Sequence, residues 1–192
     1  TNPILRVRYE LICANRSDLK QIHALAKEEI GDSVITLKSL HEWYTANSAS
    51  LWVLWQHAYS VLFPTKRLVG FFSVVPITRQ ATDKLLKNRE GGYRVTVESI
   101  VPEGQKPTAW YVSAIAAKGE IARGRVVQQL QAFILAKANE AGLILAAPTT
   151  DDGLRITLEN GLLPTDATTP ELETIFYRDL NTAVMTQRNQ GG

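Results

Sequence analysis

Residues 111–127 read YVSAIAAKGEIARGRVV, and this stretch decides the fold because it contains a strand, a connection and the start of a helix. Its first half is apolar and rich in β-branched residues, which is typical of a buried strand. Its second half has apolar residues at helical spacing. Gly124 lies at the junction between Arg123 and Arg125. A helix start presents unpaired N–H groups and a positive dipole end, so two added cations predict an anionic ligand there.

Two alternatives remain open for this junction. Gly124 is also compatible with a tight strand-to-helix connection that binds nothing. Arg123 and Arg125 are compatible with ordinary surface charge near a helix start.

Length and composition limit the class of protein. The chain has 192 residues, of which 45% are apolar and 21% charged, and this predicts one globular domain over residues 1–180 with a polar tail at 181–192. A net charge of +2 and the lack of a basic stripe argue against a nucleic-acid partner. No metal site is expected, because His23, His41 and His57 are scattered and no ligand motif occurs.

The sequence also gives expectations about location. Apolar runs are interrupted well before the length of a membrane span, about 18 residues, so no membrane association is expected. No signal peptide is expected, because the first residues lack a charged region followed by a small-residue cleavage site. Cys13 is the single cysteine, so no disulfide forms within the chain, and a cytoplasmic setting fits.

The order of elements predicts the fold class. Strands are expected at 7–14, 51–56, 67–77, 93–101, 108–117, 143–148 and 171–180, with a bulge at Gly70. Helices are expected at 15–31, 36–47, 78–92, 123–142 and 149–161. This order predicts an α+β (or α/β) domain with a mixed sheet.

The stretch around Gly124 and the order of elements together resemble the GNAT acetyltransferases. In that family a central strand leads through a Q/R-x-x-G-x-G/A loop into a long helix. Here Gly124 matches the first glycine of the motif, while Ile121 and Val126 stand at its first and last positions. The likeness extends over residues 7–180: SDLKQIHALAKEE resembles the first helix, LENGLLP a later helix end and ETIFYRDL the last strand.

The resemblance implies a mostly antiparallel, twisted sheet that is flanked by helices. It also implies a function. The protein would be an N-acetyltransferase that transfers an acetyl group from acetyl-CoA to an amine on a small molecule or peptide. Ser113, Ala114 and Ile115 would pair with the pantetheine arm of acetyl-CoA. The pyrophosphate would be held by the residues from the loop into the helix: Ala122, Arg123, Gly124, Arg125, Val126 and Val127.

The acid and base of this chemistry are less well marked. Thr157 stands where many family members carry a proton-donating Tyr, and Ala109 where many carry a Glu that acts as a base through water. Glu98 is the candidate catalytic base, because a carboxylate in an apolar strand beside the central one would have a raised pKa and accept an amine proton. The alternative is a solvent-facing position in an alternating strand.

Other questions stay open at this stage. The rival function is a catalytically inactive GNAT-like domain that binds CoA, or nothing, and serves as a regulatory or interaction module. The sequence leaves the acceptor undefined and a homodimer open. Six aromatic residues would either shape an acceptor pocket or pack in the core: Trp43, Tyr44, Trp52, Trp55, Tyr59 and Phe63.

Overall fold

The computed structural model describes residues 6–59, 64–87, 94–137, 139–165 and 174–181, and these confirm the α+β class. The strands are β1 (Arg6–Cys13), β2 (Leu51–Tyr59), β3 (Pro64–Ile77), β4 (Ala109–Ala117), β5 (Leu143–Ala146), β6 (Leu163–Pro164) and β7 (Phe176–Asp179). The helices are α1 (Leu19–Ile30), α2 (Leu37–Ala46), α3 (Arg79–Lys87), α4 (Glu120–Lys137) and α5 (Asp151–Glu159).

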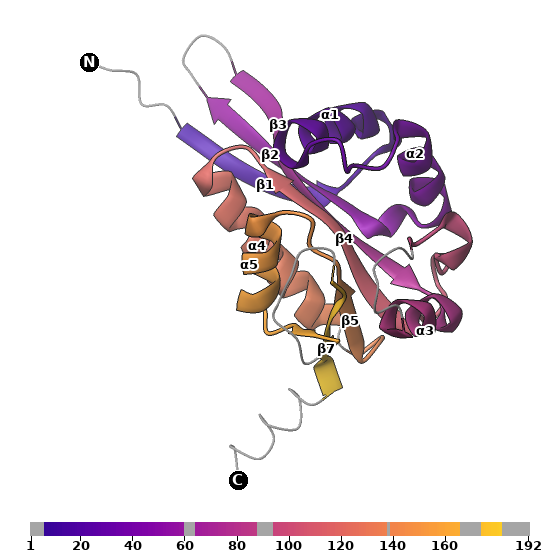
Figure 1. Cartoon of the computed structure of the whole chain (residues 1–192). Helices are drawn as coiled ribbons and strands as arrows, with labels where there is room; N and C mark the ends of the chain where they lie inside the picture. Colours follow the sequence, from indigo (N-terminus) through magenta and orange to yellow (C-terminus); the bar gives the residue numbers. More distant parts are fainter. Residues whose placement is uncertain (1–5, 60–63, 88–93, 138, 166–173, 182–192) are drawn as a thin grey trace.

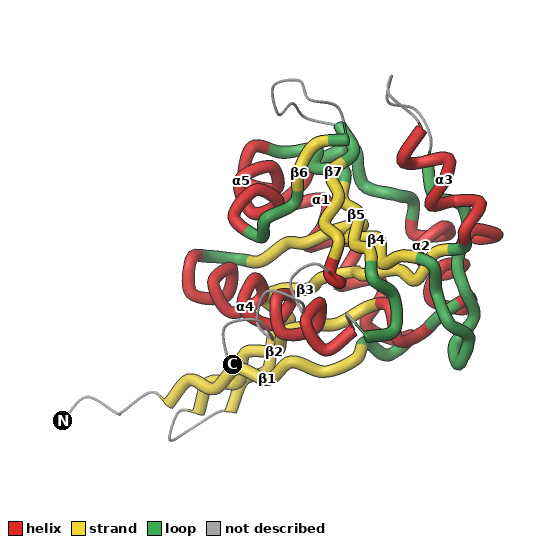
Figure 2. Tube along the Cα trace, turned by 90° about the horizontal axis from the view of Figure 1, so that it is seen from below, coloured by secondary structure: helices red, strands yellow, loops and turns green. Residues whose placement is uncertain are grey.

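The strands form one mixed sheet in the order β1-β2-β3-β4-β5-β7-β6. Every neighbouring pair is antiparallel except β4 and β5, which are parallel. A parallel pair needs a long crossover connection, and α4 provides it. Figure 2 shows β5, β7 and β6 continuing the sheet beyond β4.

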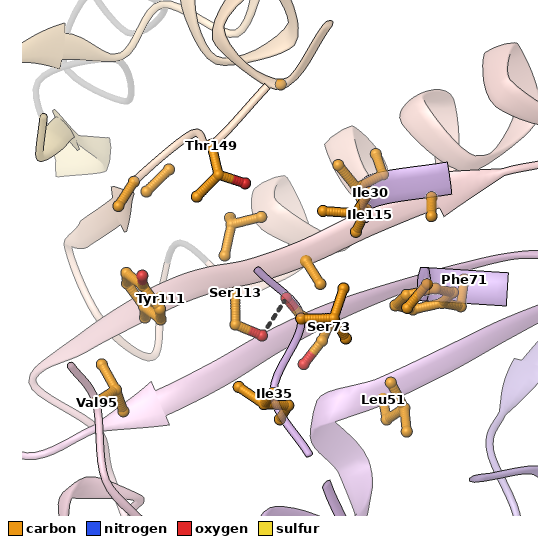
Figure 3. A pocket seen from close by; sticks show the side chains of 18 of the residues that line it. Ile30, Ile35, Leu51, Phe71, Ser73, Val95, Tyr111, Ser113, Ile115 and Thr149 are labelled. Carbon is orange, nitrogen blue, oxygen red and sulfur yellow. Dashed lines mark hydrogen bonds between the residues drawn. The ribbon is translucent and has the colours of Figure 1, made fainter. Parts of the chain in front are cut away.

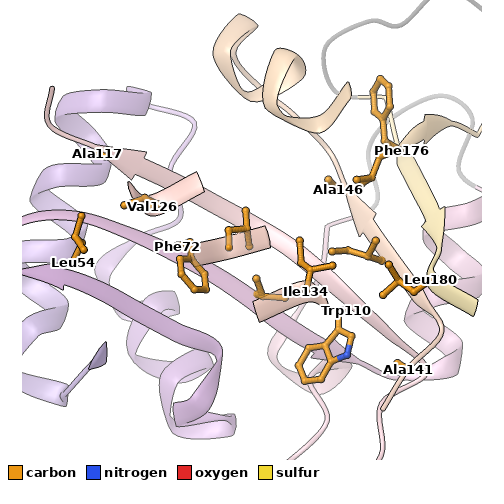
Figure 4. Packing of buried hydrophobic residues seen from close by; sticks show 14 of the residues in the cluster. Leu54, Phe72, Trp110, Ala117, Val126, Ile134, Ala141, Ala146, Phe176 and Leu180 are labelled. Atoms are coloured by element: carbon orange, nitrogen blue, oxygen red, sulfur yellow. The ribbon is translucent and has the colours of Figure 1, made fainter. Parts of the chain in front are cut away.

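Helices cover both faces of the sheet (Figure 1). On one face α1 packs with Leu19, Ile22 and Leu25 against β2 and β3, and α2 adds the partly buried Leu37 and Leu40. On the other face α4 packs through Val126, Leu130 and Ile134, and α5 lies beside it. Figure 4 shows this second cluster, in which Phe72 of β3 and Val126 of α4 are completely buried. Full burial of a side chain of this size contributes about 1.5–3 kcal/mol to stability.

Local signals set several boundaries. The side chain of Thr36 accepts a hydrogen bond from the Ser39 N–H and starts α2. Thr150 does the same for α5 through the N–H of Gly153. Gly31 ends α1 with φ +95°, a conformation that favours glycine. The bulge expected at Gly70 is confirmed, because pairing shifts between Leu54↔Gly70 and Trp55↔Leu68.

The expected strand at 93–101 is wrong. Residues 97–99 form a 3-10 turn, and Ile100 makes only an isolated bridge to Ile77. The main-chain N–H of Ile100 bonds to the carbonyl of Val97, so a turn hydrogen bond replaces the ladder. The N–H of Val101 bonds to the Pro76 carbonyl and that of Thr78 to the Ser99 carbonyl, so only the end of the segment reaches the end of β3, and its buried Val95 and Ile100 pack with residues of α3.

Other expected boundaries differ from the structure. The long helix begins at Glu120 and ends at Lys137, rather than running over 123–142, because Arg123 already bonds back to the carbonyl of Gly119. The two-residue strand β6 was not expected, and the last strand covers only Phe176–Asp179. Residues 88–93, 171–173 and the tail beyond 181 lie outside the described residues, and one domain over 1–180 stays a prediction.

Candidate active site

The sheet opens between β4 and β5. The two strands pair only at Trp110↔Ile144, Tyr111↔Leu145 and Val112↔Ala146. Beyond Val112, β4 continues to Ala117 while it pairs with β3 alone among the described strands. The backbone groups on the β5 side of 113–117 are therefore available to a ligand.

A cavity of about 920 Å³ lies at this opening and reaches both faces of the sheet. We call one part the α1–α2 half, and its wall includes Ile22, Ile30, Ile35, Leu51, Phe71 and Tyr111. We call the other part the α4–α5 half, and its wall includes Val112, Ile115, Arg123, Val126, Thr149 and Ile156. Figure 3 shows Tyr111, Ser113 and Ile115 of β4 running along the cavity. Two ligands could thus approach one point from opposite faces.

A bulge lies at the point where the sheet opens. Ser73 pairs with Ala114 and Val74 with Val112, so Ser113 is an extra residue in β4. Its side-chain Oγ donates to the carbonyl of Ser73 over 3.5 Å, which is a long hydrogen bond. A bulge re-aims the backbone and is common next to active sites.

The start of α4 offers N–H groups to an anion. Gly119 precedes the helix with φ +83°, and the N–H of Arg123 is the first to bond back, over 3.0 Å to the Gly119 carbonyl. The N–H groups of residues 120–122 therefore have no acceptor within the helix. Gly124 lies one turn further in, where its N–H belongs to the helical ladder. A Cβ on Gly124 would meet open space, so the described residues give no steric reason for glycine there.

The structure brings some of the predicted site residues together and separates others. The cavity wall contains Glu98, Ser113, Ala114, Ile115, Arg123 and Val126. The predicted phosphate ligands Ala122, Gly124, Arg125 and Val127 do not line it.

The two arginines that flank Gly124 point to different partners. Arg125 lies over the ring of Tyr9 on β1, with its guanidinium carbon 4.7 Å from the ring centroid. Arg123 forms an ion pair with Asp152 at the start of α5, with 3.2 Å between Nη1 and Oδ2. Asp152 also accepts from Arg155 over 3.4 Å. Arg123 thus bridges the two helices that border the α4–α5 half, whereas Arg125 is engaged elsewhere.

Glu98 does not have the environment expected from the sequence. It lies in the 3-10 turn and is fully exposed at the edge of the cavity, not within an apolar strand. A hydrogen bond from the Thr96 side chain lowers the pKa of the Glu98 carboxyl instead of raising it. The carboxylate is therefore ionised at neutral pH, and the expectation of a raised pKa is wrong.

Thr157 and Ala109, which stand where many GNAT proteins carry an acid and a base, offer little acid–base chemistry. The hydroxyl of Thr157 donates to the Gly153 carbonyl over 2.7 Å, so its proton is engaged within α5. Ala109 is completely buried at the start of β4. Neither position replaces the acid or base that the resemblance would place there.

Tyr111, Ser73 and Asp152 line the cavity but were not singled out from the sequence. Burial raises the pKa of the Tyr111 phenol to about 12, so it stays protonated at neutral pH. Asp152 carried a usable signal, since Asp151 and Asp152 follow a capping Thr150 and mark the start of a helix. Ser73 carried none, because its place in the cavity depends on strand pairing.

Of the aromatic residues in the first third of the chain, some line the cavity and others pack in the core. Trp43 and Tyr44 line the α1–α2 half of the cavity. Trp52 stacks on Phe72 in the core, with ring centroids 6.4 Å apart, and Trp55 is buried. Tyr59 is exposed, and Phe63 lies outside the described residues.

Solved structures superpose on this fold over most of the chain. The loading GNATL domain of CurA from Lyngbya majuscula superposes with a TM-score of 0.62 at 14% identity, over 91% of this chain and 99% of that one. A GNAT-family acetyltransferase from Listeria monocytogenes gives 0.52 at 8% identity, over 90% and 95%. The chain has the GNAT acetyltransferase fold. A chain from the crystal structure of the NatC complex bound to Gag peptide and CoA also superposes, with a TM-score of 0.54 at 9% identity, over 91% of this chain and 99% of that one.

No family model and no curated protein sequence matches the chain. None of the helices in the described part of the chain has the length and apolarity that spanning a bilayer needs.

Proposed function

We propose that this chain is an N-acetyltransferase that transfers the acetyl group of acetyl-CoA to an amine. The cavity that crosses the sheet beyond Val112 carries the proposal, because it lets a cofactor and an acceptor meet from opposite faces. The GNAT fold of the chain supports the same reaction class.

The residues along the opening fit acetyl-CoA. The free edge of β4 at Ser113, Ala114 and Ile115 offers alternating backbone donors and acceptors, which suit the amides of a pantetheine arm. The N–H groups of residues 120–122 and the guanidinium of Arg123 suit the phosphates. This assignment keeps Ala122 and Arg123 and moves the phosphate contact one turn away from Gly124.

The chain's own groups would act on the reaction mainly by position. Acetyl-CoA supplies a thioester carbon that a neutral amine attacks. Backbone N–H groups at the free edge of β4 would polarise the carbonyl, and the cavity walls would hold the two reactants together. Glu98, ionised at the cavity edge, would accept the amine proton through water. Because the hydroxyl of Thr157 is engaged, we assign no proton donor for the departing sulfur.

A second candidate is a CoA-binding module without catalysis. It is favoured by the engaged Thr157, the buried Ala109 and the ion pair between Arg123 and Asp152 in the α4–α5 half.

One pair of measurements separates the two candidates. Thermal unfolding with a hundredfold excess of acetyl-CoA over its dissociation constant should show stabilisation by about 2.7 kcal/mol under either candidate. Release of CoA thiol in the presence of a panel of amines is expected only for the transferase. Stabilisation without thiol release would support the module, and no stabilisation would contradict both.

A further inference from the structure

The α1–α2 half of the cavity has a wall whose chemistry limits the acceptor. Its surface comes from the buried face of α1, the segment before α2, and strands β2 and β3. The large apolar side chains in it are Ile22, Ile30, Ile35, Leu51 and Phe71. An acceptor that fills this half therefore buries apolar surface against these side chains, which favours a hydrocarbon body.

Most polar side chains of this half are already paired with the protein. His23 bonds through Nε2 to the Ile35 carbonyl over 3.1 Å. The hydroxyl of Ser50 donates to the carbonyl of Asn47 over 2.7 Å, and that of Tyr44 to the carbonyl of Ala14 over 3.1 Å. These groups add little hydrogen bonding for a ligand.

Two hydroxyls of this half are different. Within the described residues, neither Ser73 Oγ nor Tyr111 Oη has a hydrogen-bonding partner, and both residues line the cavity. Ser73 lies between Phe71 and Val75 on the face of β3 that looks toward α1 and α3. Tyr111 pairs with Val75 and shares that face. Figure 3 shows both side chains beside Ser113, where the sheet opens.

Charged groups of this half stay at its edge. Glu29, Glu42, Arg94 and Glu98 are all exposed, and Glu42 is paired with Lys38. No carboxylate among the described lining residues is buried beside Ser73 or Tyr111. A second ammonium group on an acceptor would therefore enter the apolar half without a counter-ion, which is strongly unfavourable.

We propose that the α1–α2 half binds an apolar primary monoamine, with its hydrocarbon body against Ile22, Ile35 and Phe71 and its nitrogen at the hydroxyls of Ser73 and Tyr111. This inference rests on the proposed function and names its acceptor class. Both hydroxyls are neutral and can donate or accept, so they suit the uncharged amine that attacks a thioester. Acceptors with several ammonium groups, such as polyamines, fit the same wall poorly.

Two amines of equal length give the test. With saturating acetyl-CoA, we expect kcat/KM for hexylamine to exceed that for 1,6-diaminohexane at least 20-fold. Equal values, or a preference for the diamine, would overturn the monoamine inference and leave the transferase standing. Thiol release with neither amine, nor with a peptide amine, would overturn both proposals. Release with the peptide alone would overturn only the monoamine inference.

A designed carboxylate sharpens the test. Ile35→Glu should reduce the hexylamine preference at least tenfold, because the new charge pairs with the second ammonium. The matched control is Leu163→Glu, the same change at an exposed position on β6 that does not line the cavity, and it should leave the ratio unchanged. An unchanged ratio in folded Ile35→Glu would contradict the placement.

Two smaller changes test the hydroxyls without risk to folding. Ser73→Ala and Tyr111→Phe should each raise KM for hexylamine about three- to tenfold and leave KM for acetyl-CoA within twofold. A change in neither constant would remove these hydroxyls from the acceptor site.

Discussion

The two halves of β4 differ in their neighbours although they belong to one strand. Residues 110–112 are paired with β3 and β5 on their two sides, whereas residues 114–117 are paired with β3 alone. The first half is therefore held along both backbone edges, and the second has one edge that no described strand pairs with. Helices on both faces pack against it: Ala117 lies in one cluster with Val126 of α4, and Ala116 in the other with Ile22 of α1. The proposed cofactor contact thus depends on a strand whose pairing with β5 ends part-way.

The largest expected effect contrasts the two halves directly. Ile144 is completely buried on β5 opposite Trp110. The Ile144→Ala variant should therefore have an unfolding free energy about 3 kcal/mol lower than the parent. Ile115 lies half-buried at the cavity, so Ile115→Ala should lose about 1 kcal/mol or less. Urea unfolding measures both, with an unchanged m-value as the control. Equal losses would mean that the open half is as much core as the paired half.

The second prediction concerns Tyr111, at the border of the two halves. Its pKa of about 12 in the folded protein lies above the ordinary value of 10.0, so folding favours the neutral phenol. This contribution is fully present below pH 10 and is lost as pH rises toward 12, by about 2–3 kcal/mol. Relative to Tyr111→Phe, the parent should therefore lose stability only above pH 10 in chemical unfolding. A constant difference from pH 8 to 12 would contradict the burial of the phenol.

A third prediction compares Gly70, which lies on β3 and faces α4, with Gly124, which lies within α4. A Cβ on Gly70 would lie 2.6 Å from Cγ2 of the buried Val126, so Gly70→Ala should lose about 1–3 kcal/mol. A Cβ on Gly124 meets open space inside a helix, so Gly124→Ala should gain about 0.5–1 kcal/mol. Thermal unfolding measures both changes. Calorimetry should find acetyl-CoA affinity unchanged in Gly124→Ala, and a large loss would restore Gly124 as a phosphate contact.

The smallest effect on stability is expected at the cavity edge. Glu98→Gln should change unfolding free energy by less than about 0.5 kcal/mol, because the side chain is exposed. If Glu98 accepts the amine proton, the variant should lose the acidic limb of the kcat/KM profile. That limb should lie below the ordinary carboxyl range, because the Thr96 hydrogen bond lowers the pKa. An identical profile in parent and variant would remove Glu98 from the mechanism.

Local patterns were enough for most of the fold. Thr36, Gly31 and Thr150 mark helix ends through hydrogen bonds within a few residues, and such signals can be read from the sequence. The segment 93–101 was expected as a strand because it alternates apolar and polar residues, but residues 97–99 close a 3-10 turn and only Ile100 bridges to Ile77 of β3. Strand formation depends on a partner, which the segment itself does not specify.

The site was less predictable for the same reason. Ser113, Ala114 and Ile115 were predicted because they lie within one strand that the resemblance covers. Ser73 and Tyr111 meet only through the pairing of β3 with β4, nearly forty positions apart in sequence. The helix was expected from Arg123, but α4 begins at Glu120; Gly119 followed by an acidic residue is the local signal for this earlier start.

The ion pair between Arg123 and Asp152 has a consequence for how the α4–α5 half is entered. Both side chains are substantially exposed, at 39% and 53%, and such a pair contributes about 0.2–1 kcal/mol. Because this energy is comparable to RT, about 0.6 kcal/mol, a substantial fraction of the molecules has this contact broken at any moment. Added salt raises that fraction by screening. The guanidinium of Arg123 is thus released by thermal motion alone.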